Sequence, residues 1–123
     1  MPQDVLHELS AAAKDLLYPS ESDSPFEPFV WPTAPNDSPA SQVAAHSDPS
    51  KTIKEIPLPD FFAQLDDSDD AARFRQLKAA LQRLLADPRV FRVGIGQVQV
   101  DIYILGRTPN NNWAGLHTLS IET

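Results

Sequence analysis

The chain has 123 residues, of which 41% are hydrophobic, and this is enough for one domain with one core. It contains no cysteine, so disulfide bonds and thiolate metal sites are excluded. The net charge of −7 resides entirely in residues 1–50. This distribution disfavours nucleic acid as a ligand and favours a basic partner. Acidic residues can also serve solubility alone.

The first half of the chain predicts a helix, a turn, a strand and a loop. Apolar residues at three-to-four spacing predict a helix over 4–17, which Pro19 ends. Residues 20–25 predict a polar turn, and the aromatic segment 26–31 predicts a strand that Pro28 restricts to a sheet edge or a bulge. Residues 33–50 are rich in Pro, Ser, Asp and Ala and predict a mobile loop.

The second half predicts two helices and three further strands after a short strand over 52–56. A short helix over 59–65 turns Phe61, Phe62 and Leu65 inward. The clearest helix covers 69–86 and ends before Pro88, with an apolar stripe of Phe74, Leu77, Leu81, Leu84 and Leu85. Strands follow at 90–93, 98–104 and 116–121, joined by turns at 94–96 and 108–112.

Period-two alternation assigns the faces of the last two strands. It places one set of side chains together, namely Val98, Val100, Ile102 and Ile104, and it places Leu119 with Ile121. Trp31 and Trp113 are expected to pack in the core. Because consecutive strands joined by tight turns pair antiparallel, we expect an α+β domain over 1–123 with helices packed on a mainly antiparallel sheet.

Few residues indicate catalysis or metal binding. His7, His46 and His117 are too far apart in the sequence for a zinc site and are expected at the surface. Gly94-Ile95-Gly96 does not open a helix and predicts a hairpin turn. The cluster of Asp66, Asp67, Asp69 and Asp70 lacks the glycine and the distal glutamate of an EF-hand, so helix capping explains it better. We therefore expect neither an enzyme nor a bound cofactor.

The chain ends and its apolar runs bear on localisation. The N-terminus lacks the basic and apolar regions of a signal peptide. No apolar run approaches the roughly 20 residues that span a bilayer. We therefore expect a cytoplasmic protein that binds neither membrane nor nucleic acid.

Three segments resemble the nuclease A inhibitor family. The first is LLYPSESDSPFEPFVW at 16–31, the second is VQVDIYILGRTP at 98–109, and the third is the tail 113–123 with its Glu-Thr end. Members of this family are small bacterial proteins that block sugar-non-specific ββα-metal nucleases. The resemblance implies an α/β/α sandwich with helices on both faces of the sheet, similar to the PR-1-like fold.

The resemblance also implies a mechanism and a set of site residues. The C-terminal carboxylate of Thr123 would reach the Mg²⁺ of the nuclease, and Glu21 in the Ser20-Glu21-Ser22 turn would lie at the same site. Further contacts are expected from Asp23, Glu122, Asp67 and Asp69, in a 1:1 complex formed by a chain that is monomeric when free. Mg²⁺ prefers oxygen ligands, and a terminal carboxylate with a pKa near roughly 3.5 is ionised at neutral pH.

The sequence leaves alternatives open. Glu21 could instead cap a turn, and Thr123 could be a frayed terminus. The segment before the long helix lacks the aromatic residue of the family, which bears on affinity and on the choice of target. A non-inhibitory binding or scaffold domain of the same fold is the first alternative. A small-ligand or metal-binding protein that uses residues 66–70 is the second.

Overall fold

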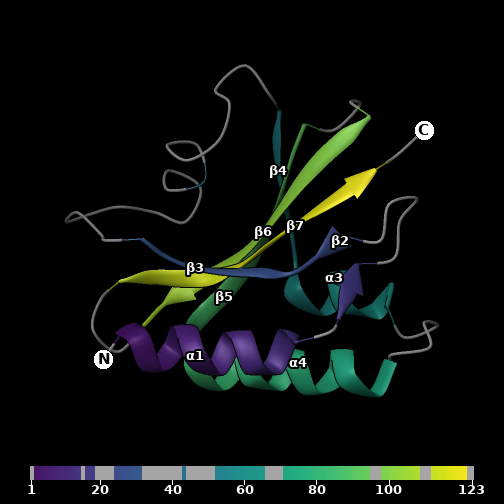
Figure 1. Cartoon of the computed structure of the whole chain (residues 1–123). Helices are drawn as coiled ribbons and strands as arrows, with labels where there is room; N and C mark the ends of the chain where they lie inside the picture. The colour runs from purple at the N-terminus through teal and green to yellow at the C-terminus, as the bar shows by residue number, and fades with distance from the viewer. Residues whose placement is uncertain are drawn as a thin grey trace.

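The computed structural model describes residues 2–14, 16–18, 24–31, 43, 52–65, 71–94, 98–108 and 112–121. Its elements in chain order are α1 (Pro2–Ala13), β1 (Leu17–Tyr18), β2 (Ser24–Pro25), β3 (Glu27–Trp31), β4 (Ile53–Ile56), α3 (Leu58–Ala63), α4 (Ala71–Leu84), β5 (Ala86–Val93), β6 (Gln99–Arg107) and β7 (Trp113–Ile121) (Figure 1). Five strands form an antiparallel sheet in the order β3-β7-β6-β5-β4, and β1 and β2 pair as a separate two-stranded ribbon. The α+β class with an antiparallel sheet is therefore confirmed.

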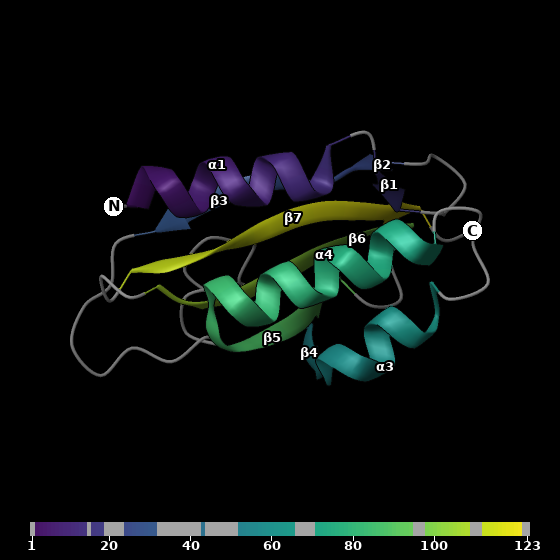
Figure 2. The same ribbon diagram turned by 90° about the horizontal axis from the view of Figure 1, so that it is seen from below.

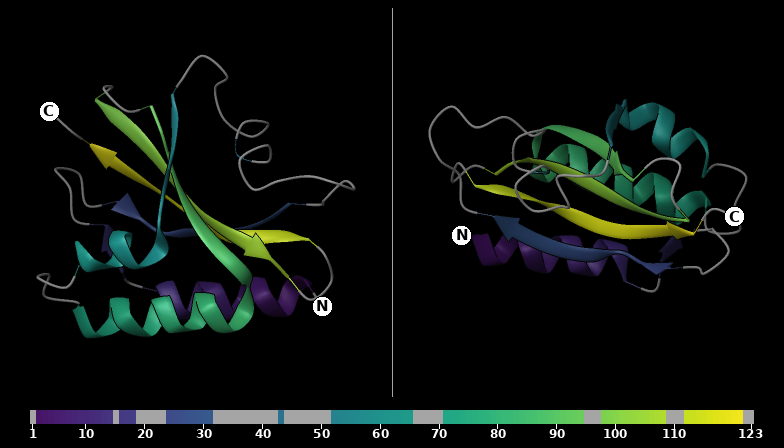
Figure 3. Two further views of the ribbon diagram at one scale, coloured as in Figure 1. Left: turned by 180° about the vertical axis from the view of Figure 1, so that it is seen from behind. Right: turned by 90° about the horizontal axis from the view of Figure 1, so that it is seen from above.

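The described helices lie on one face of the five-stranded sheet, which we call the helix face (Figures 2 and 3). The core there joins the apolar sides of α1, α3 and α4 to Val90, Ile102, Ile104 and Leu116 of the strands. Burial of these side chains is the main force that holds the layers together. A helix layer on the second face was also expected; in the apolar cluster on that face, the one residue outside the strands is Val43, which is in helical conformation.

The opposite face of the sheet carries the Phe, Tyr and Trp side chains of the five strands, and we call it the aromatic face. Its buried cluster consists of Val43, Phe91, Val93, Leu105 and Trp113, with Phe29, Trp31, Ile53 and Tyr103 packed against it. Val43 is 0% exposed although it belongs to the connection between the two edge strands, β3 and β4. The other residues of the expected mobile loop 33–50 lie outside the described residues.

The first helix is shorter than its periodicity predicts. It ends at Ala13 rather than continuing to residue 17. Leu16 turns into the core, whereas Leu17 enters β1 and pairs with Pro25. The Arg73 guanidinium of α4 donates a hydrogen bond to the carbonyl oxygen of Lys14 at 2.5 Å and so satisfies a backbone acceptor just past the helix end.

The long helix is also shorter than expected, because it ends at Leu84 and Ala86 already belongs to β5. Pro88 therefore lies inside a strand rather than beyond a helix. The register of β5 against β6 shifts between Ala86 and Arg89, and Asp87 has a φ of 49°. This bulge accommodates a proline, which cannot donate a ladder hydrogen bond.

Several predicted features are confirmed. Pro28 lies in β3, which is an edge strand. Phe61, Phe62 and Leu65 are buried, as are Phe74, Leu77, Leu81 and Leu85 of the long stripe. Trp113 is buried, and Val100, Ile102 and Ile104 share the helix face. Val98 does not join them, because it precedes β6 and is exposed.

Candidate functional site

The residues that the sequence nominated for nuclease binding all lie outside the described residues: Ser20, Glu21, Ser22, Asp23, Asp67, Asp69, Glu122 and Thr123. The structure does describe the points at which their segments are attached. Tyr18 and Ser24 bracket residues 19–23, Ala71 follows residues 66–70, and Ile121 precedes the last two residues. The structure therefore shows where these attachment points lie relative to one another.

The β1–β2 ribbon and the end of β7 are joined by a hydrogen bond. Tyr18 pairs with Ser24 across the ribbon. The Thr118 hydroxyl of β7 donates to the carbonyl oxygen of Ser24 at 3.2 Å, and Thr118 is only 1% exposed. Figures 1 and 2 show the ribbon and the end of β7 on the same side of the molecule, which we call the ribbon end.

Few residues separate the two nominated carboxylates from this bond in the sequence. Glu21 precedes Ser24 by three residues, and an extended chain of that length spans about 10 Å. Thr123 follows Thr118 by five residues, which span about 17 Å at most. The two segments that carry these carboxylates are therefore attached at the same end of the molecule.

The start of α4 also lies at the ribbon end. Phe74 in the first turn of α4 meets Phe26, the residue that follows β2, with ring centroids 6.0 Å apart in an edge-to-face arrangement. The bond from Arg73 to Lys14 joins the same turn to the end of α1. The acidic segment 66–70, which leads into α4, is thus attached next to the ribbon. The attachment points of all three nominated segments thus lie on the same side of the molecule, with the start of α4 below the ribbon and the end of β7 above it in Figure 1.

Two exposed apolar side chains flank these segments. Among the described residues, Leu17 at 45% and Val98 at 60% are the exposed large hydrophobic residues. Leu17 pairs with Pro25 in the ribbon. Val98 precedes Gln99, which pairs with Ile121 at the end of β7. Sequence periodicity missed both, because it placed Leu17 on a helix stripe and Val98 on a buried strand face.

A polar and aromatic group lies on the aromatic face. The His117 Nε2 is 3.2 Å from the Asp101 Oδ1, and the His117 ring lies 4.7 Å from that of Tyr103. Burial, and secondarily the charge of Asp101, raises the pKa of Tyr103 above its ordinary value. His117 was expected at the surface but is half-buried in this group, whereas His7 is exposed and His46 lies outside the described residues.

Across the described ranges, no group of three His, Asp or Glu side chains is arranged to hold a metal ion. No described helix is long and apolar enough to cross a membrane.

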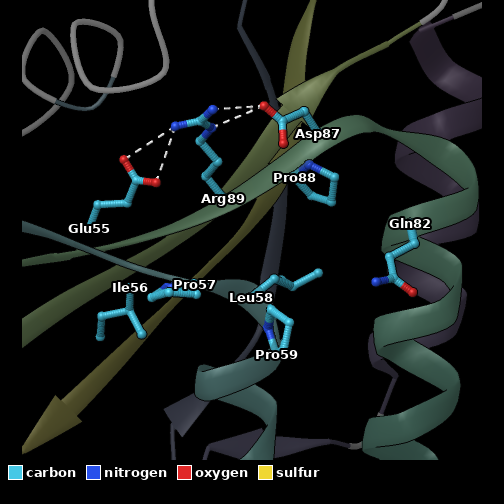
Figure 4. Close-up of a pocket in the computed structure, with 9 residues that line it drawn as sticks. All are labelled: Glu55, Ile56, Pro57, Leu58, Pro59, Gln82, Asp87, Pro88 and Arg89. Carbon is cyan, nitrogen blue, oxygen red and sulfur yellow. Dashed lines mark hydrogen bonds and ion pairs between the residues drawn. The ribbon is translucent and has the colours of Figure 1, made fainter.

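A cavity of about 400 Å³ lies between the β4–α3 junction and the start of β5 (Figure 4). Arg89 reaches across it to Asp87, with Nη2 2.8 Å from Oδ2, and to Glu55, with Nη1 3.2 Å from Oε2. The hydrogen bond and the charge of Asp87, followed by the charge of Glu55, raise the pKa of Arg89. Two carboxylates already compensate this guanidinium, so it fastens β4 to the bulge of β5 rather than offering a charge to an anion.

Comparison with known proteins bears on the ribbon end. The family model described as nuclease A inhibitor-like protein matches residues 3–123. No curated protein matches the chain. The family match includes the ribbon, the start of α4 and the whole of β7, so every segment that meets at the ribbon end lies within it.

Proposed function

Because the chain belongs to the nuclease A inhibitor-like family, we propose that it inhibits a sugar-non-specific ββα-metal endonuclease by filling its active site. The observation that carries this proposal is the hydrogen bond between Thr118 and Ser24, which joins the strand leading to Thr123 to the ribbon that carries Glu21. Carboxylates from two distant parts of the sequence can thereby converge on one partner.

The proposed mechanism is imitation of the substrate. The terminal carboxylate of Thr123 would ligate the Mg²⁺ of the partner, a hard cation that prefers oxygen ligands. Glu21 would bind beside it, with Ser20, Ser22, Asp23 and Glu122 contacting the surrounding surface. A carboxylate resembles a phosphate in charge but offers no P–O bond to cleave. The inhibitor therefore occupies the site without being turned over and needs no catalytic group of its own.

The rim of the proposed interface combines charge with apolar contact. Asp67 and Asp69 would face a nuclease surface that is built to bind polyanions. The family's aromatic residue is missing from that segment, and we propose that the exposed side chains of Leu17 and Val98 supply apolar contact instead. The net charge of −7 would accelerate association with a basic enzyme, and more strongly at low ionic strength.

The remaining parts of the proposal concern the state of the protein. We propose that residues 1–123 form one cytoplasmic inhibitor domain, monomeric when free, that binds its nuclease 1:1. A layered fold related to the PR-1-like proteins is part of the same proposal. It is supported by the packing of three helices on an antiparallel sheet.

A nuclease digestion assay with ββα-metal enzymes tests the function. Glu21→Gln, deletion of Thr123, and extension of the chain beyond Thr123 should each weaken inhibition, because each removes or displaces a carboxylate. Glu8→Gln is the matched control, since it removes the same charge from α1, where Glu8 forms an exposed ion pair with Arg83 at 3.6 Å. Full potency of the Glu21 and Thr123 variants would overturn the active-site model.

The wild-type chain provides the second decision. If it fails to inhibit every ββα-metal nuclease tested, the inhibitor function is wrong, and a non-inhibitory binding domain of the same fold becomes the better description. A calcium- or magnesium-dependent rise in melting temperature of the isolated chain would favour metal binding through residues 66–70.

A further inference from the structure

We propose that Thr118 is a positioning residue that sets the spacing between the two carboxylate-bearing segments of the inhibitor. This inference rests on the proposed function and deepens it. Thr118 need not touch the nuclease; it would act through Ser24 and through β7, of which it is a part.

Strand pairing alone does not fix the ribbon against β7. β1 and β2 form a sheet of their own, separate from the five-stranded sheet. The ladder between β3 and β7 runs from Trp31 opposite Trp113 to Glu27 opposite His117. Thr118 is the next residue of β7, so its hydroxyl continues the connection just where the ladder ends. The bond from the Thr118 hydroxyl to the carbonyl oxygen of Ser24 is thus a direct link between the ribbon and β7 beyond the β3–β7 ladder.

The burial of Thr118 indicates what its hydroxyl contributes. The residue is 1% exposed and lies on the helix face of β7, two residues from the fully buried Leu116. Valine has the same shape and would serve apolar packing at this position. Burying a hydroxyl without a partner is costly, and here the carbonyl oxygen of Ser24 accepts its hydrogen bond at 3.2 Å.

The Thr118–Ser24 hydrogen bond would hold the ribbon in place against β7 before the nuclease binds. Glu21 and Thr123 must reach one metal site together, and they are attached on opposite sides of the Thr118–Ser24 bond. If the ribbon can move relative to β7, the two carboxylates have to be brought into position during binding, which costs conformational entropy. We expect this cost to appear mainly as faster dissociation of the complex.

The experiment compares substitutions at two buried threonines. Thr118→Val removes the bond and keeps the shape of the side chain, whereas Thr118→Ser keeps the hydroxyl. Thr108→Val is the matched control, because Thr108 is 4% exposed and its Oγ1 accepts a hydrogen bond from the Asn112 backbone at 3.1 Å, at the opposite end of the β6–β7 hairpin. All variants are measured below their melting temperatures, with folding verified by circular dichroism.

Thr118→Val should raise the inhibition constant by about tenfold, Thr118→Ser should restore it to within about twofold, and Thr108→Val should leave it unchanged. The dissociation rate should account for the loss. Wild-type inhibition by Thr118→Val, or an equal loss in Thr108→Val, would overturn the positioning role. If Glu21→Gln and deletion of Thr123 weaken inhibition but Thr118→Val does not, only the role of Thr118 fails. If none of the three weakens it, the active-site model of the proposed function fails.

Discussion

Val43 offers a sharp test of how the aromatic face is covered. Its side chain is 0% exposed and packs with Phe91, Val93, Leu105 and Trp113, although its neighbours in the sequence predict a loop. Val43→Ala removes two carbon groups, which costs about 1.6 kcal/mol at about 0.8 kcal/mol for each. A cavity of about 40 Å³ would add about 1 kcal/mol. We therefore expect a loss of about 2–3 kcal/mol in the free energy of unfolding.

Urea denaturation measures this loss directly. Tryptophan fluorescence is a suitable probe, because Trp31 and Trp113 both belong to the aromatic-face cluster. The midpoint should fall while the slope with urea stays constant. Val98→Ala is the matched control: the same change at a side chain that is 60% exposed should cost less than about 0.5 kcal/mol. An equally small loss in Val43→Ala would refute the packing of Val43 against the sheet.

Three further predictions concern Gly115, Tyr103 and Leu17. In Gly115→Ala the new Cβ would collide with the Ile104 carbonyl and lie 2.8 Å from the Leu105 Cα. We therefore expect the free energy of unfolding, measured by urea denaturation, to fall by more than about 3 kcal/mol. Wild-type stability of this variant would contradict the prediction. The raised pKa of Tyr103 means that the folded state holds its proton more tightly than the unfolded state, so the stability it contributes is present below pH 10.0 and lost as pH rises further. Tyr103→Phe should flatten that decline, and an unchanged slope would count against it. Leu17→Ser should weaken nuclease inhibition by about tenfold with little change in melting temperature, whereas unchanged inhibition would exclude Leu17 from the interface.

Local patterns in the sequence were sufficient for several elements. The stripe of Phe74, Leu77 and Leu81 predicts a helix and its buried side, because a period of 3.6 residues places those side chains on one face. Pro28 predicts an edge strand or a bulge, because proline has no N–H to donate to a neighbouring strand, and β3 is indeed an edge strand. The motifs at 16–31 and 98–109 were specific enough to indicate the family that the match over 3–123 shows.

The ends of the helices required tertiary information. Periodicity continues past Ala13, but the chain leaves the helix so that Leu16 reaches the core and Leu17 pairs in the ribbon. The helical periodicity also continues past Leu84, but β5 begins at Ala86 and pairs with β6 through a bulge. In both places the partner that ends the helix comes from elsewhere in the chain, so no local pattern records it.

The sequence by itself determined the types of the longer elements, the acidic half of the chain and the family. Only the tertiary structure decided that the three described helices share one face and that Val43 packs on the other. It also decided that Thr118 bonds to Ser24, 94 residues away, so that the ribbon and the end of β7 meet. Periodicity records which side of an element is buried, because burial depends on the residue's own chemistry. The partner of that side depends on how distant segments pack, and no short stretch of sequence specifies it.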